Sequence, residues 1–135
     1  MQKIYFGMTN KRHYAAEGKD NPWAGKKVLI VGMARSGIAA AQLLCREGAV
    51  VTVSDLKPRD SFGEQLDVLN DLPITYRLGE DGLDALKGQD MLLISPGVPI
   101  NAPVVKVAQA AHIPVIIVDR MIEISDTDLF TCWIG

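Results

Sequence analysis

The sequence is poor in the features that mark several classes of protein. It has only two cysteines, Cys45 and Cys132, among 135 residues, which is too few for a disulfide framework and lacks the spacing of a zinc site. A reducing cytoplasm is therefore the expected location. No apolar run is close in length to a membrane span, which needs about 20 residues. The polar N-terminus lacks the long apolar stretch of a signal peptide.

Charge of one sign is also not in excess. The 14 lysines and arginines nearly balance the 16 acidic residues, which leaves a formal net charge of −2. Such a balance gives no basic surface for nucleic acid or for an anionic membrane, and we expect neither as a partner. The chain also contains no G-x-x-x-x-G-K-[ST] loop, which holds the phosphates of ATP in many enzymes.

What the sequence does contain is a regular alternation of apolar strands and helical segments. Strands are predicted over five ranges: 27–32, 49–55, 74–79, 90–97 and 113–119. Helices are predicted over 35–48, 61–70 and 102–112, with a short helical piece at 83–86. This alternation predicts an α/β fold, a Rossmann-like five-stranded parallel sheet of order 3-2-1-4-5 with helices on both faces.

Particular residues indicate where the helices begin and end. Gly48 is a natural C-cap for the first helix. Ser61 and Glu64 form an S-x-x-E capping box at the start of the second, and Pro103 suits the first turn of the third. Residues 1–25 are polar and non-periodic, and we expect them to form a poorly ordered leader before the domain at 26–119.

Three loops are expected to meet at one edge of this sheet. In open α/β sheets, ligands bind beyond the carboxyl ends of the strands, where the winding direction reverses. With the predicted order, that crevice lies between the first and fourth strands. The loops there are GMARSG (32–37), SDLKPR (54–59) and SPGVP (95–99). Their convergence predicts a ligand site.

The first loop has the chemistry of an anion site. A helix that begins near Arg35 leaves its early backbone N–H groups unpaired, and its dipole favours a phosphate there. Gly32 permits the tight turn and Gly37 lets the helix pack close to the strand. Ala34 stands where a dinucleotide-binding loop usually carries its middle glycine, while Ser36 adds a donor. A ligand-free connection between strand and helix remains an alternative.

The other two loops add a carboxylate and a rigid shelf. Asp55 ends the second strand, where an acid can accept a hydrogen bond from ribose hydroxyls or from a base N–H, although a plain turn residue is the alternative. We expect Asp55→Ala to weaken nucleotide binding more than folding, because a strand-end loop carries little packing. Gly97 follows Pro96 in a stiff loop that permits close backbone approach.

Two stretches together resemble the N-terminal domain of the D-glutamate-adding ligases of the Mur ligase family. They are KKVLIVGMARSGIAAAQLLCREGAVVTVSD (26–55) and LLISPGVPINAPVVKVAQAAHIPVI (92–116). The resemblance covers residues 25–118. It implies a domain that binds UDP-N-acetylmuramoyl-L-alanine for an ATP-dependent, amide-forming ligase of bacterial peptidoglycan synthesis.

The resemblance also implies a set of substrate-binding residues. The loop at 34–37 would hold the uridine and its phosphates, the stretch at 55–57 would lie at the uracil end, and the stretch at 95–97 would close the other side. The implied set is Ala34, Arg35, Ser36, Gly37, Asp55, Leu56, Lys57, Ser95, Pro96 and Gly97.

The sequence departs from the family's pattern after the fifth strand. Residues 120–135 only loosely resemble the family's joining segment toward an ATP-binding domain. The resemblance implies that ATP and magnesium are bound by a central domain and D-glutamate by a C-terminal domain, and we expect this chain to comprise neither. We therefore expect no catalytic residue, no metal site and no activity from this chain alone, because phosphoryl transfer needs groups from those domains.

Two other readings remain open. In the first, the chain is an NAD(P)-binding module of an oxidoreductase. Asp55 then holds the adenosine ribose, or Lys57 and Arg59 hold a 2′-phosphate. Ala34 argues against that reading, as does the lack of an evident partner for hydride transfer. The third reading is a UDP-sugar-binding protein without catalysis.

Overall fold

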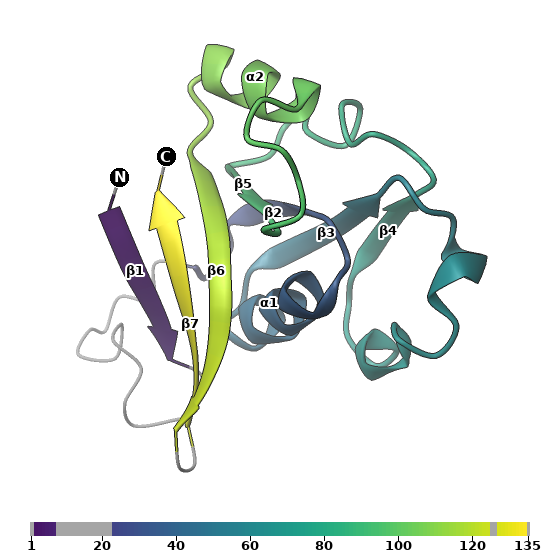
Figure 1. Cartoon of the computed structure of the whole chain (residues 1–135), viewed down its shortest axis with the longest axis vertical. Coiled ribbons are helices and arrows are strands. Elements are labelled where there is room, and N and C mark those ends of the chain that lie inside the picture. The colour runs from purple at the N-terminus through teal and green to yellow at the C-terminus, as the bar shows by residue number, and fades with distance from the viewer. Residues whose placement is uncertain (1, 8–22, 125–126, 135) are drawn as a thin grey trace.

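The computed structural model describes residues 2–7, 23–124 and 127–134. In these residues a seven-stranded sheet has the order β1-β7-β6-β5-β2-β3-β4 (Figure 1). Its strands are β1 (Gln2–Gly7), β2 (Lys27–Val31), β3 (Val50–Asp55), β4 (Thr75–Leu78), β5 (Met91–Ile94), β6 (Val115–Ile124) and β7 (Thr127–Ile134). The helices are α1 (Arg35–Arg46) and α2 (Pro103–Ala110).

The five predicted strands are β2 to β6, and their order and direction are confirmed. β2 pairs in parallel with β3 and β5, β3 with β4, and β5 with β6. Counted from β2, this is the predicted order 3-2-1-4-5. The sheet therefore reverses its winding direction between β2 and β5, as the site prediction requires.

Two antiparallel strands extend the sheet beyond β6. β7 pairs with β6, and β1 pairs with β7 at the outer edge. The expectation of a poorly ordered leader is therefore wrong for residues 2–7, where Ile4, Tyr5 and Phe6 are residue types that favour strands. The remainder of the predicted leader, residues 8–22, lies outside the described residues. The limits of the predicted domain and of the joining segment at 120–135 remain predictions.

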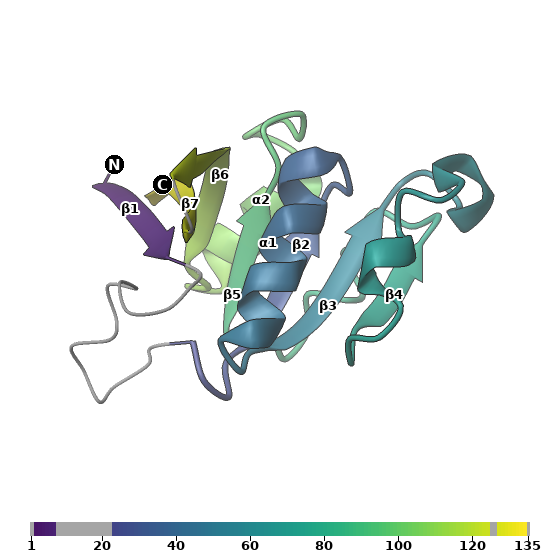
Figure 2. The same cartoon turned by 90° about the horizontal axis from the view of Figure 1, so that it is seen from below.

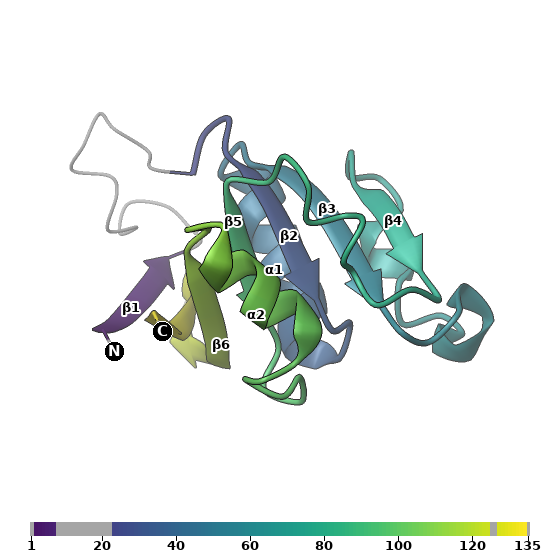
Figure 3. The same cartoon turned by 90° about the horizontal axis from the view of Figure 1, so that it is seen from above.

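The two helices cover opposite faces of the parallel strands. Figure 2 shows α1 in front of the sheet, and Figure 3 shows α2 in front with α1 behind the strands. Along β2, Val28 and Ile30 pack in the core on the α1 side, while Leu29 and Val31 pack in the core on the α2 side. Burial on both faces explains why this strand is a continuous apolar run. Neither helix in the described part of the chain is long and apolar enough to cross a membrane.

The end of α1 is closed as the sequence predicts. Gly48 has φ 89°, its N–H donates to the Cys45 carbonyl at 3.1 Å, and the Ala49 N–H donates to the Leu44 carbonyl at 2.9 Å. These two bonds form a Schellman motif, in which glycine takes the left-handed position without steric cost. Pro103 occupies the first turn of α2, which was also predicted.

The predicted helix at 61–70 is wrong. That segment forms two short 3₁₀ turns, Arg59–Phe62 and Asp67–Leu69. Gly63 between them has φ 55° and ψ −127°, which ends any helical run. Phe62, Leu66 and Leu69 are nevertheless buried in the core on the α1 side. The predicted helical piece at 83–86 is also wrong, because this segment forms only hydrogen-bonded turns.

Candidate functional site

The three predicted loops lie side by side at the carboxyl edge of the sheet. They follow β2, β3 and β5, which are neighbours in the strand order. Backbone hydrogen bonds join them, since the Gly32 N–H donates to the Ser54 carbonyl at 2.8 Å and the Ser95 N–H donates to the Val31 carbonyl at 3.0 Å. The fold therefore brings together the loops that the sequence indicated.

Gly32, Gly37 and Ser95 hold the first and third loops against each other. The Ser95 hydroxyl donates to the Gly32 carbonyl at 2.6 Å, and Ser95 is only 2% exposed. A Cβ atom on Gly37 would overlap the Gly32 carbonyl oxygen and would lie 2.8 Å from the Ser95 Oγ. Gly37 thus permits close packing, as predicted. The buried Ser95 hydroxyl has a structural partner, and its contact with a ligand remains a prediction.

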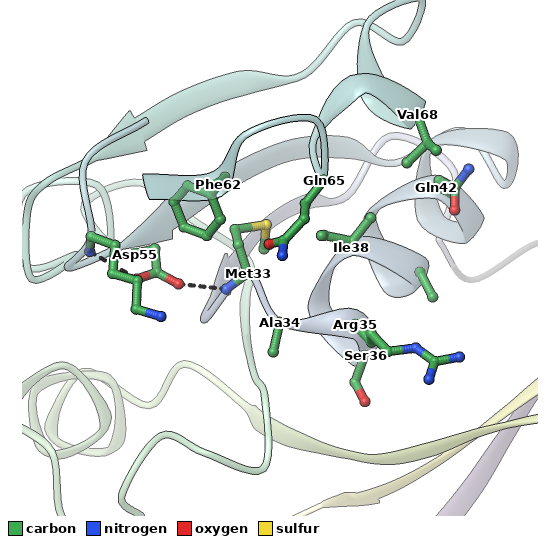
Figure 4. Close-up of a pocket in the computed structure, with 12 residues that line it drawn as sticks. Met33, Ala34, Arg35, Ser36, Ile38, Gln42, Asp55, Phe62, Gln65 and Val68 are labelled. Atoms are coloured by element: carbon green, nitrogen blue, oxygen red, sulfur yellow. Dashed lines mark hydrogen bonds between the residues drawn. The ribbon is translucent and has the colours of Figure 1, made fainter. Parts of the chain in front are cut away.

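Asp55 joins the second loop to the first. Its Oδ2 accepts a hydrogen bond from the Met33 N–H at 2.7 Å, and its Oδ1 accepts one from the Lys57 N–H at 2.9 Å (Figure 4). The expectation that Asp55 contributes little to folding therefore needs correction. Each carboxylate oxygen has a further lone pair, so the side chain can still accept a hydrogen bond from a ligand.

The start of α1 is open to an anion. Ala34 is the N-cap residue and provides no side-chain cap, and no acidic residue lies in the first turn. Because the first N–H groups of a helix lack intrahelical acceptors and carry partial positive charge, an anion is stabilised there. Arg35 is exposed beside these groups, and Figure 4 shows Arg35 and Ser36 on the first turn of α1.

A pocket of about 900 Å³ lies on the α1 side of the first loop. Arg35 and Ser36 line it close to the start of α1, and Figure 4 shows the remaining walls. These walls come from the loop after β2, from α1, from the end of β3 and from the segment between β3 and β4. They consist of Met33, Ala34, Ile38, Ala39, Gln42, Asp55, Lys57, Phe62, Gln65 and Val68. We refer to this cavity as the larger pocket.

A second pocket of about 370 Å³ lies on the α2 side. It is lined by the loop after β5, which includes Gly97, and by apolar residues of the first turn of α2. Leu56, from the loop after β3, also lines it. Two acidic residues, Glu80 and Asp81, complete its wall. The two pockets share Met33, Ala34, Asp55 and Lys57. We refer to this cavity as the smaller pocket; its volume falls within the range of small-molecule sites.

Eight of the ten predicted residues line these pockets. Those in both are Ala34, Asp55 and Lys57; those in the larger are Arg35 and Ser36; those in the smaller are Leu56, Ser95 and Gly97. Gly37 and Pro96 line neither. Arg59 also lines neither, and its guanidinium carbon lies 4.7 Å from the centre of the Tyr76 ring.

Sequence reasoning missed the residues that follow β4. Glu80 is held by a two-point contact with Arg77. Its Oε2 accepts a hydrogen bond from Nε at 3.0 Å, and its Oε1 lies 3.0 Å from Nη2 in an ion pair. The Glu80 carboxylate raises the pKa of the Arg77 guanidinium by this hydrogen bond and by its charge. The sequence could have indicated these residues, because ligands bind at the carboxyl ends of parallel strands. That rule applies to the loop after β4 as well as to the three loops named above.

In the ranges that the structure describes, no group of three or more His, Cys, Asp or Glu side chains is arranged to hold a metal ion. The sequence also lacks the G-x-x-x-x-G-K-[ST] loop. The two pockets meet at the start of α1, where Met33, Ala34, Asp55 and Lys57 line both of them.

Comparison with known proteins gives a consistent result over this region. Residues 26–117 match the family described as "Mur ligase MurD-like, N-terminal domain". A UDP-N-acetylmuramoylalanine--D-glutamate ligase of Koribacter versatilis is 44% identical over 92 residues, which are 68% of this chain and 20% of that protein. The protein of that name in Acidobacterium capsulatum is 39% identical over 92 residues, with the same shares.

The protein of the same name in Geotalea daltonii is 34% identical over 110 residues, which are 82% of this chain and 22% of that protein. The chain thus spans about a fifth of the length of the curated relatives that it matches. The family match includes all three loops that meet at the carboxyl edge of the sheet. The chain belongs to the family of Mur ligase MurD-like N-terminal domains.

Proposed function

We propose that this chain is the UDP-N-acetylmuramoyl-L-alanine-binding domain of an ATP-dependent ligase that adds D-glutamate during peptidoglycan precursor synthesis. The observation that carries the proposal is the family match over residues 26–117. The names of the relatives supply the substrates of the reaction. The position of both pockets at the carboxyl edge of the sheet supports it, because nucleotides bind there in related α/β folds.

In this proposal the first turn of α1 holds the diphosphate. Its unpaired backbone N–H groups point outward from the start of the helix, and Arg35 adds a positive charge in the larger pocket. The nucleoside then lies in the smaller pocket, against Leu56 and Gly97. Binding a remote handle in this way positions a reacting carboxylate elsewhere on the substrate, which lowers the entropic barrier of the chemical step.

The chemical step itself is proposed to use groups outside these 135 residues. In this proposal ATP activates the substrate carboxylate for amide formation at a site on another domain of the parent ligase. Central and C-terminal domains of a parent ligase are the proposed partners of this domain. We therefore expect this chain to bind the substrate and to show no ligase activity by itself.

The NAD(P) alternative gains no support from the site. Arg59, which that reading placed on a 2′-phosphate, lies over the Tyr76 ring instead. Two acidic residues, Glu80 and Asp81, line the smaller pocket, and their negative charge disfavours a phosphate there. Ala34 keeps its methyl group where a dinucleotide-binding loop carries glycine.

The direct test is a parallel titration of the purified chain with UDP, NADP⁺ and UDP-N-acetylmuramoyl-L-alanine by calorimetry. We expect UDP to bind and the muramoyl-alanine part to strengthen binding. Nuclear magnetic resonance shifts are expected at Arg35, Ser36, Asp55 and Gly97. Binding of NADP⁺ without UDP would overturn the proposal, and silence from all three ligands would contradict a nucleotide-binding role for this domain.

A charge variant sharpens this test. Removing the positive charge with Arg35→Ala is expected to weaken UDP binding by about ten-fold, the effect of one charge-assisted phosphate contact. Lys106→Ala is the matched control, because Lys106 is also an exposed cation but lines neither pocket. Equal losses in the two variants would show that the diphosphate does not lie at the start of α1.

A further inference from the structure

The charged side chains are distributed unevenly between the two pockets. The larger pocket is lined by two cations, Arg35 and Lys57, and by one acid, Asp55. The smaller pocket shares Lys57 and Asp55, but its lining also includes two further acidic residues, Glu80 and Asp81. Formal charge therefore changes from positive at the start of α1 to negative at the loop after β4.

The acidic residues are fixed in place by the protein. The Glu80 carboxylate accepts a hydrogen bond from Arg77 Nε and forms an ion pair with Arg77 Nη2. The Glu80 backbone N–H donates to the Asp55 carbonyl at 3.2 Å. Asp81 accepts a hydrogen bond from the Leu83 N–H at 3.0 Å through its Oδ1. Fixed carboxylates are effective acceptors for neutral donors and unfavourable neighbours for anions.

The separation of the two ends matches the size of a nucleoside. The first turn of α1 follows β2, whereas Glu80 follows β4, and β3 lies between these strands. Neighbouring strands are roughly 4.8 Å apart, so the two ends of the site are separated by roughly 10 Å. A nucleotide with its 5′ phosphates at α1 thus directs its sugar or base toward the acidic end.

We propose that Glu80 and Asp81 orient the nucleotide and exclude nucleotides that carry a second phosphate on the ribose. Arg77 contacts Glu80 rather than the pocket, and its guanidinium offsets part of the Glu80 charge. The inference rests on the proposed function, since it concerns the nucleotide of the same site. The preferred ligand class is a nucleoside diphosphate whose only phosphates are at the 5′ end.

The test compares the affinities for UDP and for UDP with an additional 2′-phosphate. We expect wild type to prefer UDP by about ten-fold or more, the effect of one added phosphate beside a fixed carboxylate. Glu80→Gln and Asp81→Asn each narrow this ratio, because each removes one negative charge. Arg77→Gln widens it, because Glu80 loses its compensating cation. Glu64→Gln is the control, since Glu64 is exposed and lines neither pocket.

A general loss of folding cannot make the affinity ratio narrower in Glu80→Gln and wider in Arg77→Gln. If wild type and all four variants show the same ratio of affinities for the two nucleotides, the inference is overturned. The proposed function stays intact in that case, provided that UDP still binds. A narrower ratio in Arg77→Gln would overturn it as well. If UDP does not bind to wild type, the proposed function fails first, and this inference fails with it.

Discussion

Replacement of Asp55 by alanine tests whether this residue joins two loops of the fold. The carboxylate accepts the Met33 N–H at 2.7 Å and the Lys57 N–H at 2.9 Å. Met33 is buried, with 1% of its surface exposed. After truncation, water can solvate the exposed Lys57 N–H, whereas the Met33 N–H remains in a partly buried position without its acceptor.

The magnitude follows from these two environments. A hydrogen bond to a charged group contributes about 1.5–3 kcal/mol, and an exposed one contributes much less. We therefore expect Asp55→Ala to lower the free energy of unfolding by about 2–3 kcal/mol. A domain of ordinary stability, with about 5–15 kcal/mol, remains folded after this loss.

Urea unfolding followed by circular dichroism measures this effect. The midpoint is expected to fall with little change in the m value, because the surface exposed on unfolding is the same. Hydrogen exchange at the Met33 amide should also accelerate. Asp55→Asn should recover at most half of the loss, since its amide oxygen can accept only one of the two N–H groups. A loss below about 0.5 kcal/mol, the size of a typical surface substitution, would refute the reasoning.

Three further predictions concern the core, a helix end and the thiol. Gly37→Ala should lower the free energy of unfolding by about 1–3 kcal/mol, because the new methyl group would overlap the Gly32 carbonyl oxygen. Gly97→Ala is the control, since a Cβ there meets nothing within 4 Å. An equal loss in the two variants would contradict the prediction. His112 has φ 59°, so His112→Gly should raise stability by about 1 kcal/mol by removing the left-handed strain. A lower thermal midpoint would contradict that reasoning. Burial raises the pKa of the Cys45 thiol, so less thiolate is present at mildly alkaline pH. Its alkylation, followed by peptide mass spectrometry, should be slower in the folded chain than in urea, and equal rates would contradict it.

The parallel part of the fold could be predicted because each of its strands carries a strong local signal. β2 and β5 are buried on both faces, and so their sequences are continuous apolar runs. Right-handed crossovers then restrict the strand order to few possibilities. The two antiparallel strands, β7 and the edge strand β1, were not predicted, because their pairing joins segments from opposite ends of the chain, which no local pattern indicates.

The segment at 61–70 shows why a helix-like pattern can mislead. Phe62, Leu66 and Leu69 have helical spacing and are buried on the α1 side, so the pattern correctly indicated which residues face the core. Gly63 adopts a positive φ and interrupts the backbone. The capping box at Ser61 predicted a start that the chain does not use. Tertiary packing fixed the apolar side chains without a continuous helix.

The candidate site was predictable in its place but not in its internal bonds. The ends of parallel strands meet at one edge, so the loops after β2, β3 and β5 had to converge. The bond from Ser95 to Gly32 joins residues 63 positions apart, and the bond from Met33 to Asp55 spans 22 positions. Such contacts depend on ångström-level geometry, which neither periodicity nor spacing provides.

These internal bonds determine which substitutions can identify a ligand contact. Asp55 and Ser95 both hold loops together, so a loss of UDP affinity in their variants would have two causes, a missing contact and a displaced loop. Arg35 and Lys57 are exposed, and neither forms an ion pair with another residue in the described part of the chain. A change in affinity after neutralising either cation, at unchanged unfolding free energy, therefore reports on the ligand itself. The placement of the diphosphate should rest on those two cations, with the loop-joining residues used to measure how far binding depends on the shape of the site.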